Sequence, residues 1–150
     1  MLGSRHGLAW RRLARIEHGG REGLGLREWT MLPHWYSVTV DCVDPERMAT
    51  FWGALLRRER SAEMDGEGWA TVGSRDDAQP RITFQRVPEP RSGKVRLHLD
   101  VRVDDIAEGM AEVEHLGGAS TGERHEYDEG VVVVMTDPEG HEFCLVELYD

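Results

Sequence analysis

The chain has 150 residues, enough for one domain with a core of its own. Its first 30 residues hold six arginines and three glutamates, whereas residues 31–150 hold 12 basic and 25 acidic groups, so the net charge of −10 comes from an acidic body. An acidic body argues against nucleic-acid binding, because phosphate backbones are bound by positive surfaces. No stretch is long and apolar enough to suggest a membrane span.

Residues 1–30 are predicted to be a disordered N-terminal extension, and residues 31–150 to form the folded domain. The basic run Leu8–Ile16 lacks the apolar core of a secretory signal, which leaves a membrane-surface or targeting helix as the alternative to disorder. Lys94 is the only lysine among 18 basic residues, which indicates the codon usage of a GC-rich bacterial genome. Both cysteines lie in apolar strand-like sequence, as buried free thiols do, so we predict a cytoplasmic protein.

The first half of the domain predicts a strand, a helix and three short strands. Residues 36–43 alternate apolar and polar side chains, which is typical of a half-buried strand. Asp44 and Pro45 then suit the N-cap and first residue of a helix that ends near residues 57–59, with an apolar stripe of Met48, Phe51, Trp52, Leu55 and Leu56. The strands that follow are expected near Arg60–Met64, Trp69–Gly73 and Arg81–Val87, with a hairpin turn at residues 65–66.

The same order of elements begins again after a proline-marked connector at residues 87–93. The opening motif of residues 37–44 returns as residues 98–105, and Asp104 or Asp105 is expected to cap a second helix that Gly117 and Gly118 end. Three strands should follow, near Ala119–Arg124, Val131–Met135 and Glu142–Leu148. The sequence therefore predicts two copies of one βαβββ unit, over about residues 35–88 and 94–149.

In both units the helix must cover the apolar face of its sheet, which leaves the alternate side chains on a polar face. We expect this face to line a trough that binds a small-molecule ligand, with simple solvation as the alternative. Trp69 is included as an aromatic side chain suited to packing on a ligand. The other candidate ligand-binding residues are Ser37, Thr39, Asp41, Thr83 and Gln85 in the first unit, and His98, Asp100, Arg102 and Cys144 in the second.

The duplicated unit, the strand-Asp-helix openings and the turn Thr136-Asp-Pro-Glu-Gly-His-Glu-Phe-Cys-Leu145 resemble the vicinal oxygen chelate superfamily. This superfamily includes glyoxalase I, fosfomycin and bleomycin resistance proteins and extradiol dioxygenases. The resemblance covers roughly residues 35–149, and residues 84–90 and 96–100 resemble the small glyoxalase-like domains in particular. It implies an α+β fold in which two modules form one U-shaped mixed β-sheet with helices on the outer face. It also implies edge-to-edge pairing of modules within one chain or between two, so a homodimer is one expected arrangement.

In metal-using relatives the ligands come from the opening and closing strands of each half, which the resemblance carries onto Ser37, Gln85, His98 and Cys144. Only His98 is a strong ligand at its position, and hard cations prefer carboxylate oxygens, so we predict no metal site and no cofactor. We interpret His141 as a turn residue and Glu147 as an exposed strand end.

His98 is the candidate catalytic residue, because an imidazole can act as acid or base near neutral pH. Arg102 could hold a carboxylate or enediolate oxygen, or it could be neutralised by Asp41 or Asp100. Cys144 is a nucleophile only in an electropositive setting, and we expect an unreactive buried thiol instead. The favoured function is metal-free binding of a small organic ligand. A lyase or isomerase of the glyoxalase type and an accessory protein that binds a partner are the alternatives.

Overall fold

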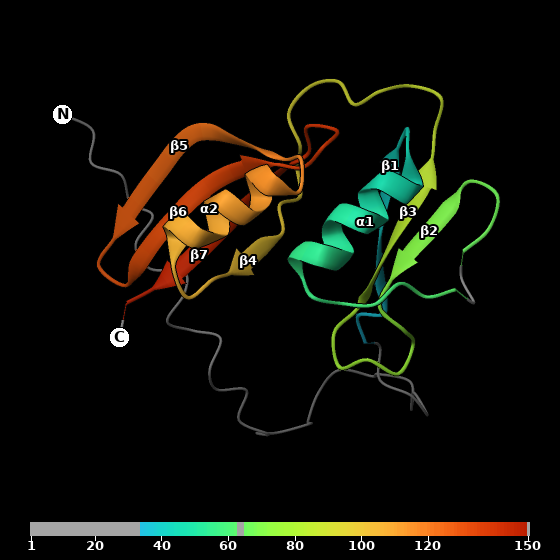
Figure 1. Ribbon diagram of the computed structural model, residues 1–150, viewed down its shortest axis with the longest axis horizontal. Helices are drawn as coiled ribbons and strands as arrows, with labels where there is room; N and C mark the ends of the chain where they lie inside the picture. The colour runs from blue at the N-terminus through green and yellow to red at the C-terminus, as the bar shows by residue number, and fades with distance from the viewer. Residues whose placement is uncertain (1–33, 63–64, 150) are drawn as a thin grey trace, which may run out of the picture. The chain divides into compact units, whose positions relative to one another are not determined.

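A computed structural model describes residues 34–62 and 65–149, which from Trp35 onward belong to one compact unit. The predicted extension at residues 1–30 therefore lies outside the described residues, as does Met64. The described elements, shown in Figure 1, are β1 (Ser37–Cys42), α1 (Pro45–Leu55), β2 (Trp69–Val72), β3 (Arg81–Arg86), β4 (Asp100–Arg102), α2 (Ile106–His115), β5 (Ala119–Tyr127), β6 (Gly130–Thr136) and β7 (Glu142–Leu148).

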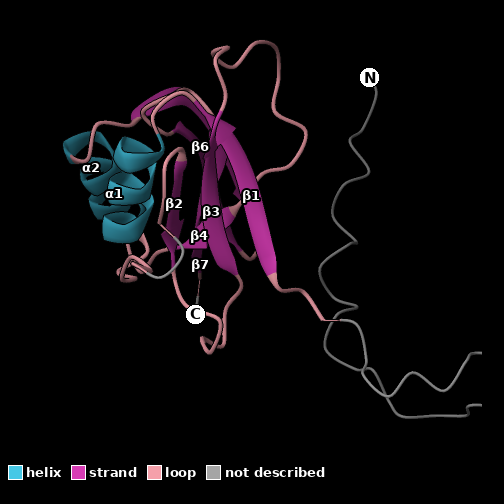
Figure 2. Cartoon of the chain, turned by 90° about the vertical axis from the view of Figure 1, so that its right-hand side faces the viewer, coloured by secondary structure: helices cyan, strands magenta, loops and turns pink. Residues whose placement is uncertain are grey.

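The strands form one mixed sheet in each module. The first sheet has the order β1-β3-β2 and the second β4-β7-β6-β5. β1 runs parallel to β3 and β4 parallel to β7, while the remaining neighbours are antiparallel. Helix α1 packs on β2 and β3, and α2 packs on β5, β6 and β7 (Figures 1 and 2). The α+β class and the two modules are confirmed, and the single continuous sheet implied by the resemblance is divided in two.

The first helix begins and buries its stripe as the sequence predicts. The Asp44 side chain accepts a hydrogen bond from the backbone N–H of Arg47, 3.1 Å long, and Pro45 takes the first helical position. Met48 and Phe51 are almost completely buried against the sheet. The local pattern is sufficient here because the cap and the stripe both lie within one short segment.

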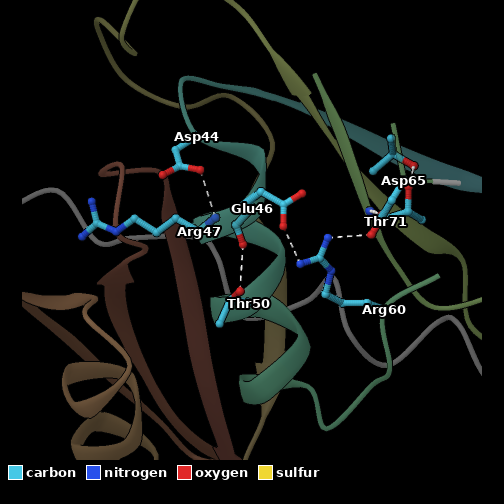
Figure 3. A network of polar contacts seen from close by, with 8 residues as sticks. Asp44, Glu46, Arg47, Thr50, Arg60, Asp65 and Thr71 are labelled. Carbon is cyan, nitrogen blue, oxygen red and sulfur yellow. Dashed lines mark hydrogen bonds and ion pairs between the residues drawn. The ribbon is translucent and has the colours of Figure 1, made fainter. Parts of the chain in front are cut away.

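The strand predicted near Arg60–Met64 is replaced, over the described residues, by a single bridge between Arg60 and Val72. Side chains make the polar contacts of this region instead, as Figure 3 shows. Arg60 contacts Glu46 and Asp65, each at 2.6 Å. The other carboxylate oxygen of Asp65 accepts the backbone N–H of Thr71 at 2.9 Å. Because this side chain occupies a donor of β2 that a further strand would bond, the ladder does not continue there.

The start of α2 is capped by Asp105, one of the two residues that the sequence predicted, and by Glu147, which it did not predict. Asp105, rather than Asp104, is the N-cap of α2, and its side chain accepts the N–H of Glu108 at 2.8 Å. The carboxylate of Glu147 accepts the N–H of Ile106 at 2.6 Å. The interpretation of Glu147 as an exposed strand end is therefore wrong, since a carboxylate at this position satisfies an unpaired donor and the positive end of the helix dipole.

One hydrophobic core joins the two modules. The ring of Phe143 in β7 lies 6.1 Å from that of Phe51 and 4.9 Å from that of Trp52, both in α1. Cys42 and Cys144 are free and buried, as predicted. No helix within residues 34–62 and 65–149 has the length and apolar character needed to cross a membrane.

Candidate functional site

The polar face of the first sheet is partly closed by its own hydrogen bonds. The register places Thr83 between Thr39 and Thr71, and the Oγ1 atoms of Thr71 and Thr83 lie 3.2 Å apart. Thr71 and Thr83 are 0% and 8% exposed, respectively. The Thr83 hydroxyl is thus bonded inside the sheet, whereas Thr39 remains exposed.

A second set of residues, side by side across this sheet, is partly exposed. Gln85 lies opposite Asp41 on one side and Trp69 on the other. Asp41 is exposed and the Trp69 side chain is 41% exposed. These three predicted ligand-binding residues therefore stand together at one end of the sheet, where a flat ligand could stack on the indole ring.

The thiol of the second sheet is buried beside a carboxylate. Cys144 lies opposite Asp100 in the parallel pair of β4 and β7 and is 9% exposed. Burial first, and then the negative charge of Asp100, raise the pKa of the Cys144 thiol to about 11. A thiol with such a pKa stays protonated at neutral pH, which supports the interpretation of a buried thiol over that of a nucleophile.

His98 lies just before β4 and is half-buried. Its Nε2 atom is 3.3 Å from the carbonyl oxygen of Val95 and 3.9 Å from Oε2 of Glu142. That oxygen also lies 3.6 Å from Nζ of Lys94, yet it is buried and accepts no hydrogen bond. Arg102 is exposed, and among the described residues it forms no ion pair with Asp41 or Asp100. The expected neutralisation of Arg102 by either carboxylate is therefore not seen.

Strand pairing corrects one equivalence between the modules. β1 pairs with β3 so that Thr39 faces Thr83, just as Asp100 faces Cys144 between β4 and β7. The counterpart of Cys144 is therefore Thr83 and not Gln85, which lies two residues further along β3. The resemblance placed Gln85 at this position, but the pairing of β1 with β3 sets Thr83 opposite Thr39.

These positions offer two strong ligands for a divalent metal ion and two weak ones. The opening and closing positions of the two modules hold Ser37, Thr83, His98 and Cys144, which are two hydroxyls, one imidazole and one thiol. A catalytic site needs about three good ligands, and Mg²⁺ or Mn²⁺ prefers carboxylates. Nor do three His, Cys, Asp or Glu side chains come together as a metal-ligand group within the described part of the chain.

Two cavities are lined by four of the ten predicted ligand-binding residues. The larger, of about 860 Å³, lies along both helices and includes Asp100 and Arg102 in its lining. The smaller, of about 420 Å³, is lined by Thr39 and Asp41 of β1 and by residues of the second module and the connector. Neither of these two cavities is lined by the other six candidates, which are Ser37, Trp69, Thr83, Gln85, His98 and Cys144.

The smaller cavity is walled by a junction that the sequence did not predict. Asp137, which is 3% exposed, accepts hydrogen bonds from Trp52 Nε1 at 3.3 Å and from the N–H groups of Glu139 and His141 at 3.0 Å. Nδ1 of His141 also lies 3.3 Å from Oδ1 of Asp137, and this hydrogen bond is the main cause that raises the pKa of His141. The role of His141 as a turn residue is thus confirmed, and the turn binds the first module through Trp52.

Glu139 makes a second connection between the modules. Its two carboxylate oxygens accept the backbone N–H groups of Val43 at 2.8 Å and Asp44 at 2.7 Å. Both donors stand where β1 passes into α1, beside the positive end of the helix. The only sequence signal for this contact was the turn motif itself, because the donors are backbone groups far away in the chain.

Comparison with known proteins identifies the family. The family model described as glyoxalase-like domain matches residues 37–146, and the chain belongs to this family. A comparison of the sequence with curated proteins finds no match.

Solved structures share the fold. A glyoxalase/bleomycin resistance protein/dioxygenase family enzyme from Burkholderia phytofirmans PsJN matches with a TM-score of 0.64 and 16% identity, over 75% of this chain and 97% of that chain. A variant of the fosfomycin resistance protein FosX from Listeria monocytogenes, solved with Mn(II) and a dihydroxypropylphosphonic acid, matches with a TM-score of 0.64 and 16% identity, over 79% of this chain and 93% of that chain. A glyoxalase/bleomycin resistance protein from Albidiferax ferrireducens T118 matches with a TM-score of 0.57 and 16% identity, over 77% of this chain and 98% of that chain. At these identities the likeness concerns the fold.

Proposed function

We propose that this glyoxalase-like domain binds a small organic ligand in the smaller cavity, without a catalytic metal. The observation that carries the proposal is the composition of the cavity wall, which both modules build. Thr39 and Asp41 come from β1, Glu142 and Phe143 from β7, and Leu99 from the segment before β4. Apolar walls with a few polar groups, in a volume of about 420 Å³, are typical of small-molecule sites.

The residues at the metal-ligand positions of relatives support the metal-free part of this proposal. Ser37 and Thr83 are poor ligands, so His98 and Cys144 lack a strong third ligand at the positions used by metal-binding relatives. Elemental analysis of protein purified without chelators should find no stoichiometric nickel, zinc, manganese or iron. About one equivalent of a single metal would contradict the proposal.

Ligand binding is tested by blocking the cavity. Leu97 is 64% exposed and lines the cavity, so Leu97→Trp should fill part of it with little effect on folding. The matched control is Leu148→Trp, at a side chain that is 46% exposed and lines neither cavity. In a thermal-shift screen, compounds that stabilise the wild type should still stabilise the control but not Leu97→Trp. Equal shifts in both variants would place the binding elsewhere.

An acid–base lyase or isomerase that uses His98 is the second candidate. It is favoured by the Glu142 carboxylate 3.9 Å from the imidazole, which could orient the ring. His98 does not line either cavity, however, so this function needs a substrate that reaches past Leu97 and Leu99. Turnover by the wild type and ligand binding by His98→Gln test this function. If the wild type shows no turnover and His98→Gln binds ligands as the wild type does, the lyase or isomerase function is rejected and the binding function remains.

A further inference from the structure

The carboxylates around the smaller cavity outnumber its positive groups. Asp41, Glu89 and Glu142 line it, and none of them accepts a hydrogen bond from the described residues. Asp137 also lines it, but its oxygens are bonded to the turn and to Trp52. Three of the acidic groups therefore have acceptor capacity left for a ligand.

Glu142 is the most specific of these acceptors. Its Oε2 atom is buried without a hydrogen-bond donor, and the nearest side-chain nitrogen atoms are too far away to donate one: Lys94 Nζ lies at 3.6 Å and His98 Nε2 at 3.9 Å. The Lys94 side chain is 65% exposed, so its attraction is weakened by solvent. A buried acceptor without a donor is costly, and a ligand N–H group would satisfy it.

Two basic side chains line the cavity, and both are hydrogen-bonded within the protein: His141 to Asp137, and Arg91 to the connector. Arg91 lines the cavity, and its Nη1 donates to the carbonyl oxygen of Gly93 within the connector. The remaining wall is largely apolar, with Leu97, Leu99 and Phe143 among its residues. The lining thus offers an apolar surface beside carboxylates that accept no hydrogen bond.

Resting on the proposed function, we infer that the ligand is an organic ammonium ion with an apolar body. Its N–H groups bind Glu142 Oε2, with Asp41 and Glu89 adding negative potential, and its carbon skeleton lies against the leucines and Phe143. A primary or secondary ammonium is specified rather than a quaternary one, because only the former can donate the hydrogen bond that the buried oxygen lacks. An anionic ligand of the same shape is disfavoured by like-charge repulsion.

The test compares three probes of one shape: phenethylammonium, the neutral 2-phenylethanol and the anionic 3-phenylpropanoate. Binding to the full-length protein is followed by chemical-shift perturbation in ¹H–¹⁵N spectra at low salt, including the indole N–H of Trp52, which lines the cavity. Small probes of this kind are expected to bind with a Kd of about 1 mM. The ammonium should bind about tenfold more tightly than the alcohol.

Variants separate this inference from the proposed function. Glu142→Gln should abolish the preference for the ammonium, whereas Glu114→Gln, on the exposed face of α2, should leave it unchanged. If Glu142→Gln does not fold, Asp41→Asn on the opposite wall should still reduce the preference, since Asp41 is exposed and unbonded. Equal or tighter binding of the alcohol or the acid, lost in Leu97→Trp, would overturn the inference and leave the binding function standing. No binding of the ammonium to the wild type would overturn the inference itself.

Discussion

Glu139 is predicted to hold the two modules together, and its replacement by glutamine tests this directly. The wild-type carboxylate accepts two backbone N–H groups, at 2.8 and 2.7 Å. In Glu139→Gln one oxygen still accepts, while the amide group turns its own N–H toward the second donor. One charge-assisted bond is lost and the other becomes neutral, which should lower the free energy of unfolding by about 2 kcal/mol. For a domain of this size the midpoint of thermal unfolding should fall by about 6–10 °C.

Urea unfolding followed by tryptophan fluorescence measures this loss, because Trp52 lies at the same junction. Amide hydrogen exchange adds a local measurement: the N–H groups of Val43 and Asp44 should exchange faster in the variant. Glu114→Gln on α2 serves as the control for removing one negative charge. A loss below about 0.5 kcal/mol, no larger than that of an ordinary surface substitution, would refute the reasoning.

Three further predictions concern the same domain. The hydrogen bond to Asp137 raises the pKa of His141, so protonated His141 stabilises the fold. This stabilisation is fully present below the unfolded pKa of about 6.5 and is lost as pH rises through the folded pKa. The stability difference between wild type and His141→Asn should therefore be larger at low than at high pH, and a constant difference would contradict this. A Cβ at Gly118 would lie 2.4 Å from a backbone oxygen of β6, so Gly118→Ala should cost about 1–3 kcal/mol by thermal unfolding, while Gly66→Ala, which meets nothing within 4 Å, should cost much less. Burial raises the pKa values of the two cysteine thiols to about 12 and about 11, so Ellman's reagent at pH 8 should label them only after denaturation, and rapid labelling of the folded protein would show them accessible.

The sequence by itself determined the elements whose signals are local. The alternation before Asp44 marked β1 and the cap at Asp44 marked the start of α1, because these patterns depend on neighbours a few residues away. The repeat of the opening motif was enough to predict two modules, each with a helix over one face of its sheet. The buried state of both cysteines also followed from the apolar faces on which they lie.

The tertiary structure decided what depends on partners that are distant in the chain. Strand pairing made Thr83, and not Gln85, the counterpart of Cys144, since the residue that lies opposite another depends on how two strands distant in the chain pair. The carboxylate of Glu139 reaches backbone donors that any sequence would offer, so no side-chain pattern announces the contact. For the same reason only four of the ten predicted ligand-binding residues line these two cavities, two in each: alternation assigns a side chain to a face, and only the packing of the modules decides which faces meet.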